Sequence, residues 1–128
     1  MRVKLLLHQF VFSKFDELIN LNNTIMSVLM EFAMFPTDKG ISVSNEVSKM
    51  IDKIRNSGIS YKLGAMGTTI ETETLAEALK IIEISYQAIE HTSERVYATV
   101  KFDIRKGKNN RMEGKVDAVE KILGSLNK

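Results

Sequence analysis

The chain is 128 residues long, with 44% hydrophobic and 27% charged residues, which is the composition of one globular domain with a single core. The absence of cysteine excludes a disulfide framework, a cysteine-based zinc site and a thiol nucleophile, and two lone histidines argue against a histidine-rich metal site. The formal net charge is only +2. The lack of cysteine fits a cytoplasmic location. No apolar run approaches the roughly 20 residues of a membrane span.

Residues 1–25 look like an extension that precedes the domain. Apolar residues recur in it at helical spacing, at Leu7, Val11, Phe15 and Leu18. The pair His8-Gln9 interrupts the apolar run at residues 5–7, and no small-residue cleavage site follows, which argues against a signal peptide. We therefore expect residues 1–25 to be peripheral and residues 26–128 to form the folded domain.

The domain opens with a strand and a helix. In residues 27–35, both sets of alternate positions are largely apolar, which predicts a strand whose two faces are both covered. Pro36 ends this strand because proline cannot donate a backbone hydrogen bond. Either Ser42 or Ser44 can cap the next helix, because a serine hydroxyl accepts a hydrogen bond from a free amide of the first turn. An apolar stripe then predicts a helix that ends at Gly58.

Residues 61–71, Y-K-L-G-A-M-G-T-T-I-E, form the stretch richest in groups that bind ligands. The sequence predicts two short strands that meet at Met66-Gly67. Gly64 and Gly67 supply backbone freedom where the chain bends or approaches another group closely. Two threonines and Glu71 follow within four residues. A plain hairpin with a glycine turn is the alternative interpretation.

Three further elements complete the chain. Thr74 and Glu77 form a capping box before an apolar-periodic helix that ends near His91. Side chains of two kinds alternate strictly over residues 96–104, which predicts a strand. A closing helix is marked by apolar residues at helical spacing, namely Val116, Val119, Leu123 and Leu126. The order βαββαβ predicts an α+β, ferredoxin-like antiparallel sheet with an additional C-terminal helix. Since no assigned helix covers the sheet face with Leu29, Ala33, Phe35 and Tyr97, we expect a homo-oligomer.

Candidate binding residues concentrate on the first strand and the hairpin. Glu31 sits among apolar neighbours, so it needs either a ligand or a basic residue on an adjacent strand. Glu71 either accepts hydrogen bonds from a ligand or stabilises the following helix N-terminus. The other candidates are aromatic, methionine, glycine and hydroxyl groups that could line a ligand site, with core or capping roles as alternatives: Phe35, Ser42, Ser44, Tyr61, Met66, Gly67 and Thr68.

No pattern of catalytic residues is visible. The chain has no Ser-His-Asp arrangement, no phosphate-binding glycine motif and no histidines at metal-ligand spacing. We therefore expect no enzymatic activity, no metal and no required cofactor. The alternative to a small-ligand binder is a regulatory or RNA-binding module, because RNA-recognition domains share this strand order. Residues 95–128 carry 9 Lys and Arg against 4 Asp and Glu, but the two kinds are interleaved, which fits a solvated face better than an RNA surface.

From Met26 onward the chain resembles the small thiamine-binding protein family of ferredoxin-like fold. The motifs that match are E-F-A-M-F-P-T-D-K-G at 31–40, S-V-S at 42–44, S-G-I-S-Y-K-L at 57–63, M-G-T-T-I-E at 66–71, R-V-Y-A-T-V-K-F-D-I-R at 95–105 and K-V-D-A-V-E-K-I-L at 115–123. The resemblance implies a non-catalytic, cytoplasmic homo-oligomer, usually a tetramer, that binds thiamine or its pyrimidine portion. The sequence departs from the family at Tyr86-Gln87, where a His-Glu pair is common, and at Thr72, where glycine often stands.

Overall fold

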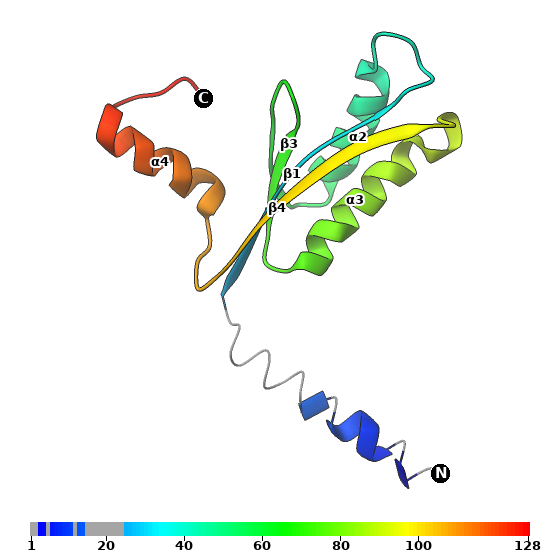
Figure 1. Ribbon diagram of the computed structural model, residues 1–128, viewed down its shortest axis with the longest axis vertical. Helices are drawn as coiled ribbons and strands as arrows, with labels where there is room; N and C mark the ends of the chain where they lie inside the picture. Colours follow the sequence, from blue (N-terminus) through cyan, green and yellow to red (C-terminus); the bar gives the residue numbers. More distant parts are fainter. Residues whose placement is uncertain (1–2, 5, 12, 15–24) are drawn as a thin grey trace.

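The computed structural model describes residues 3–4, 6–11, 13–14 and 25–128 (Figure 1). The described residues before 25 are helical, including the predicted positions Leu7 and Val11, whereas Phe15 and Leu18 lie outside the described residues. From residue 26 the elements are β1 (Met26–Pro36), α2 (Ser44–Asn56), β2 (Ser60–Leu63), β3 (Thr68–Thr72), α3 (Leu75–Ile89), a 3₁₀ turn (Glu90–Thr92), β4 (Val96–Lys106) and α4 (Arg111–Leu123).

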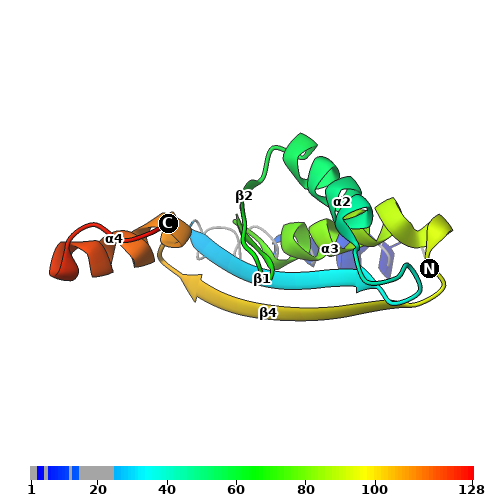
Figure 2. The same cartoon turned by 90° about the horizontal axis from the view of Figure 1, so that it is seen from above.

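The four strands form one antiparallel sheet in the order β2-β3-β1-β4, with α2 and α3 against one face (Figure 2). This is the predicted ferredoxin-like βαββαβ arrangement followed by an additional helix. β1 and β4 are each longer than expected and pair along their whole length, from Met26 opposite Lys106 to Pro36 opposite Val96. We call the face covered by α2 and α3 the inner face, and the opposite face the outer face.

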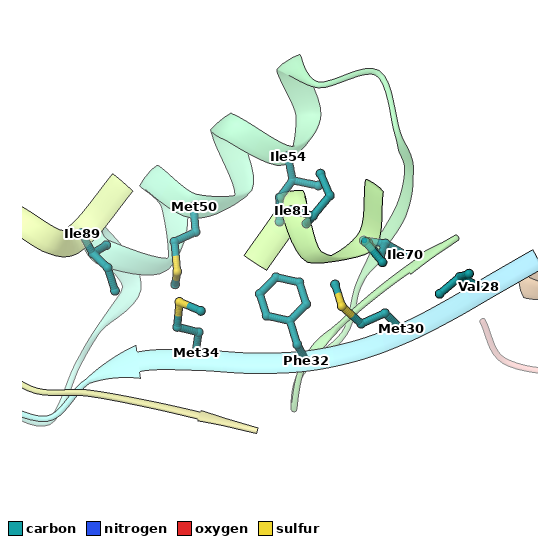
Figure 3. Close-up of a cluster of buried hydrophobic side chains, with 10 residues drawn as sticks. Val28, Met30, Phe32, Met34, Met50, Ile54, Ile70, Ile81 and Ile89 are labelled. Atoms are coloured by element: carbon teal, nitrogen blue, oxygen red, sulfur yellow. The ribbon is translucent and has the colours of Figure 1, made fainter. Parts of the chain in front are cut away.

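The core lies between the inner face and the two helices (Figure 3). Alternate residues of β1 supply one side of it because successive strand side chains point to opposite faces. The helices supply the other side. The buried cluster consists of Val28, Met30, Phe32 and Met34 of β1, Ile70 of β3, Met50 and Ile54 of α2, and Ala78, Ile81 and Ile89 of α3. Burying one such side chain fully contributes about 1.5–3 kcal/mol.

The ends of the two core helices test three predictions about helix ends. The predicted Thr74 cap of α3 is present, because the Glu77 amide donates to the Thr74 hydroxyl at 3.2 Å. The Glu77 carboxylate also reaches back, but it accepts from the amide of Glu73, the residue before the cap, at 3.2 Å. The serine cap of α2 was predicted wrongly, because Val43 occupies the N-cap position and no side chain caps the helix. Ser42 and Ser44 bond each other instead, with their hydroxyl oxygens 3.4 Å apart. Gly58 follows α2 with a φ of +77°, as expected of a residue that ends a helix.

α4 begins at Arg111, before the expected apolar stripe, and ends at Leu123, so Leu126 lies beyond it. Only its first turn meets the sheet, and the rest projects away from the domain (Figures 1 and 2). That first turn covers one end of the outer face, where Leu29 is 8% exposed, whereas Phe35 and Tyr97 at the other end stay open. The expected apolar outer face is thus covered within the chain itself at Leu29. Within the described ranges, no helix has both the length and the apolar character needed to cross a bilayer.

Candidate functional site

A pocket of about 280 Å³ opens between α2, the C-terminal half of β1 and the β2–β3 connection. We call it the hairpin pocket. Its walls are almost entirely apolar, and they come from segments far apart in the sequence. The lining residues are Phe32, Ala33, Met34 and Phe35 of β1, Val43, Val47, Met50 and Ile51 around α2, and Leu63, Gly64, Ala65, Met66, Gly67 and Thr68 of the hairpin.

Two glycines let the hairpin approach β1 closely enough to form this pocket. The Gly64 amide donates to the Gly67 carbonyl at 2.8 Å and closes the turn. A Cβ at Gly67 would lie 3.0 Å from the Phe32 carbonyl oxygen, and a Cβ at Gly64 would lie 3.1 Å from the Gly67 carbonyl oxygen. Both distances are tighter than an ordinary Cβ contact, so a side chain at either position would push the neighbouring backbone by a few tenths of an ångström, and glycine avoids this.

Thr68 supplies the side-chain polar group of the hairpin pocket. Successive residues of β3 face opposite sides of the sheet, so Thr68 lies on the inner face and Thr69 on the outer face. Phe32, the residue paired with Thr68 on β1, lies on the inner face as well. Thr68 is only 6% exposed, and no hydrogen bond joins its hydroxyl to another residue in the described part of the chain. Met66 lies at the mouth of the pocket and is 90% exposed. None of the lining residues is ionisable.

A wider, shallower groove of about 740 Å³ adjoins the hairpin pocket along α2 and β2. The two share Val43, Val47, Ile51 and Leu63. The groove adds polar groups that the pocket lacks, namely the hydroxyls of Ser44, Ser48 and Tyr61 and the exposed ion pair between Arg55 and Asp52 at 2.5 Å. An apolar recess and a more polar surface are therefore continuous.

The structure brings together six of the nine residues expected at a binding site. Phe35, Met66, Gly67 and Thr68 line the hairpin pocket, and Ser44 and Tyr61 line the groove beside it. Ser42 lines neither and reaches only the Ser44 hydroxyl. Tyr86 and Gln87 lie exposed on α3 and also line neither.

The two expected carboxylates point to the outer face. Glu31 alternates with Phe32 along β1, so its side chain lies on the side opposite the hairpin pocket. Its carboxylate pairs with Lys101 of β4 at 2.9 Å, which is the ion pair with a neighbouring strand that the sequence left open.

The Glu71 carboxylate holds the first turn of α4. It accepts from the Ser27 hydroxyl at 2.5 Å and from the amides of Arg111 at 2.8 Å and Met112 at 3.1 Å. Burial by itself raises the pKa of Glu71, but the Ser27 hydroxyl, both amides and the Arg111 charge outweigh it and hold the pKa below its usual value. The role at a helix N-terminus is therefore realised, but at α4 rather than at the helix that follows in sequence.

Sequence reasoning missed the contribution of α2 to the pocket. Met50 belongs to the buried core cluster and also forms part of the pocket wall. Val47 and Ile51 line the same wall. The signal was the apolar stripe itself, whose half-buried members face the hairpin instead of the sheet. The described residues contain no cluster of histidines and carboxylates that could hold a metal ion.

Comparison with known proteins finds a matching family and several relatives of this chain. The family model described as "Thiamine-binding protein" matches residues 30–120. A UPF0045 protein of Mycobacterium bovis is 36% identical over 98 residues, which are 77% of this chain and 96% of that protein. A UPF0045 protein of Methanocaldococcus jannaschii is 33% identical over 95 residues, 74% of this chain and 94% of its own.

Solved structures share the fold. The crystal structure of a hypothetical protein from Methanocaldococcus jannaschii matches with a TM-score of 0.66 and 33% identity, covering 73% of this chain and 95% of that one. A Thermotoga maritima protein matches with a TM-score of 0.59, covering 73% of this chain and 98% of that one. At 22% identity, the second comparison bears on the fold alone.

Proposed function

Because the chain belongs to the thiamine-binding protein family, we propose that it binds thiamine, or the pyrimidine portion of thiamine, in the hairpin pocket and does so without catalysis. One observation carries the proposal: an apolar recess of about 280 Å³ is lined by a single residue with a polar side chain, Thr68, which is 6% exposed. Small-molecule sites range upward from about 300 Å³ and are mostly apolar with few polar groups. The recess is therefore suited to one small heterocycle.

The chemistry of the walls matches a flat aminopyrimidine. Such a ring presents two apolar faces and a polar edge with ring nitrogens and an exocyclic amine. Methionine sulfurs are polarisable and contact aromatic rings favourably, and both Met34 and Met66 line the pocket. The Thr68 hydroxyl can donate to a ring nitrogen or accept from the amine. The rest of a thiamine molecule, including its cationic ring, would extend into the adjoining groove toward Asp52.

The absence of charge from the lining residues supports the non-catalytic part of the proposal. No lysine, arginine or carboxylate lines the hairpin pocket, so its walls offer no general acid or base and no partner for a phosphate group.

Titration calorimetry with thiamine, its hydroxymethyl-aminopyrimidine fragment and thiamine diphosphate tests the proposal. Thr68→Val removes the hydroxyl at nearly constant volume and should weaken thiamine binding about two- to tenfold, as expected for one neutral hydrogen bond of roughly 0.5–1.5 kcal/mol. Thr69→Val is the matched control, because the same change falls on the next residue of β3, on the outer face. Equal losses in both variants, or no heat with thiamine or its fragment at millimolar concentration, would overturn the proposal.

The rival function rests on the open end of the outer face. Phe35 and Tyr97 lie side by side there with ring centroids 5.8 Å apart, and base stacking on exposed aromatic rings is how many RNA-binding sheets work. The surrounding charges are mixed, since Lys101 pairs with Glu31. Titration with single-stranded RNA decides between the two. RNA binding with a steep salt dependence, abolished by Tyr97→Ala, would favour the rival function.

A further inference from the structure

The sulfur atoms of this chain are divided sharply between the core and the surface. The chain has 7 methionines and no cysteine, so thioethers are its only sulfur groups. Among the described methionines, Met66 alone is exposed, and its exposed fraction is 90%. The other described methionines are buried or half-buried: Met26, Met30, Met34, Met50 and Met112. One thioether is therefore far more accessible to a reagent in solution than the rest.

The turn between β2 and β3 places this exposed thioether at the mouth of the hairpin pocket. The Gly64 amide donates to the Gly67 carbonyl at 2.8 Å, and Met66 is one of the two residues enclosed by this hydrogen bond. Met66 lines the pocket in spite of its exposure. Met34 and Met50 line the same pocket, but their side chains point toward each other in the core (Figure 3). A single pocket thus has one open thioether and two shielded ones.

We propose that Met66 is a redox modification site, at which a peroxide oxidises the thioether to a sulfoxide and thereby weakens ligand binding in the hairpin pocket. In this step the O–O bond of hydrogen peroxide breaks, one oxygen forms a bond to the methionine sulfur, and the other leaves as water. The sulfur is oxidised and the peroxide is reduced. Methionine sulfoxide reductases reverse the change, so the modification can act as a switch.

The sulfoxide changes the pocket mouth in two ways. It replaces a polarisable, apolar group by a polar one that favours contact with water. It also removes the sulfur–aromatic contact that a thioether offers to a flat ring, which corresponds to a loss of affinity of about two- to tenfold. The effect on thiamine rests on the proposed function, whereas the selective oxidation of Met66 does not.

The selectivity is tested by treating the full chain with dilute hydrogen peroxide and measuring the oxygen gained by each methionine with mass spectrometry after digestion. Met66 should be oxidised at least about tenfold faster than Met30, Met34 or Met50, because oxidation follows exposure. The same treatment in urea should remove the difference, and saturating thiamine should slow the oxidation of Met66. Equal rates in the folded chain would overturn the proposal.

Titration calorimetry with thiamine then tests the effect on binding. The oxidised chain should bind about two- to tenfold more weakly, and treatment with both methionine sulfoxide reductases should restore the affinity. Met66→Leu has no oxidisable sulfur at the pocket mouth, so peroxide should not change its affinity. The double variant Met66→Leu, Ile122→Met is the matched control, because it moves the exposed methionine to α4, where Ile122 is 82% exposed. This variant should gain the oxygen and keep its affinity.

Anilinonaphthalene sulfonate, a dye that fluoresces in apolar sites, gives a readout that does not depend on thiamine. Its fluorescence with the unmodified chain should fall after oxidation and recover after reduction, whereas with Met66→Leu it should stay constant. No heat with thiamine, together with a dye response that requires Met66, would refute the proposed function and support the modification site. Selective oxidation that changes neither thiamine affinity nor dye fluorescence would overturn the proposal, and so would an equal loss of affinity in the double variant.

Discussion

Glu71→Gln is the substitution that best separates the structural role of this carboxylate from a role in ligand binding. The side chain accepts three hydrogen bonds, from the Ser27 hydroxyl and from the amides of Arg111 and Met112. Glutamine keeps the shape but replaces one carboxylate oxygen by an amide group that only donates. At least one of the three donors then loses its acceptor, and the negative charge at the start of α4 disappears.

The magnitude follows from these two losses. An unsatisfied, partly buried amide costs about 1–3 kcal/mol. A carboxylate at a helix N-terminus contributes about 0.3–1 kcal/mol more than a neutral group. We therefore expect Glu71→Gln to destabilise the domain by about 1.3–4 kcal/mol. For a domain of this length, each kcal/mol lowers the Tm by roughly 2–8 °C.

The effect should depend on pH in a defined direction. The pKa of Glu71 is lower in the folded chain than its ordinary value of 4.5. Its contribution to stability is therefore complete above pH 4.5 and is lost as the pH falls through the folded pKa. The Tm difference between the unmodified chain and Glu71→Gln should be full at pH 6–7 and should shrink below pH 4.5. Hydrogen bonds from Lys115 and Arg111 lower the pKa of Asp103 to about 2. Asp103 is present in both proteins, so its effect cancels in the Tm difference.

Thermal unfolding followed by circular dichroism, with hydrogen exchange at the amides of residues 111 and 112, measures the effect. Glu73→Gln is the matched control, because Glu73 is an exposed neighbour two residues away. Thiamine affinity should stay within about twofold, since Glu71 lies on the face opposite the hairpin pocket. An unchanged Tm together with a tenfold loss of affinity would refute this reasoning and return Glu71 to the ligand site.

Three further outcomes are expected. Gly67→Ala should weaken ligand binding at least tenfold and lower the Tm, because its Cβ would lie 3.0 Å from the Phe32 carbonyl oxygen; Gly114→Ala, in open space inside α4, should instead stabilise the chain by about 0.5–1 kcal/mol. Thr74→Ala should cost about 1 kcal/mol by removing the α3 cap, measured by urea unfolding, and no change in the urea midpoint would contradict the capping role. Deleting residues 1–23 should leave the Tm of the domain within about 2 °C, and a loss of several degrees would show that the segment stabilises it.

The fold was predictable because its signals are local. Strict alternation identified β4, the apolar row on β1 identified the core strand, and the capping box at Thr74 marked the start of α3. The start of α4 carries no such signal. Asn110, at its N-cap position, makes no side-chain cap and adopts a left-handed φ of 48°. The acceptor for the first amides is Glu71, 40 residues earlier, and a cap that distant leaves no trace in the adjoining sequence.

The candidate site was predictable only in part, for a different reason. The density of glycines and hydroxyls around Met66 correctly indicated a place where backbone and small groups come close together. Glu71 was grouped with them because it follows Thr68 by only three positions in the sequence. Period-two alternation contains the information that separates them, because Thr68 and Glu71 are three positions apart in one strand and must face opposite sides. The participation of α2 required the packing of the helix against the hairpin, which no local pattern reveals.

β3 thus serves two tasks with its two faces. On the inner face, Thr68 borders the hairpin pocket and Ile70 fills the core. On the outer face, Glu71 fixes α4 to the sheet. Since a strand projects alternate side chains in opposite directions, the two tasks share a backbone but no contacts. A substitution at residue 68 should therefore alter the pocket without loosening α4, and a substitution at residue 71 should loosen α4 without altering the pocket. A short strand with this division of labour explains why ligand-type and structural residues are adjacent in the sequence yet separate in space.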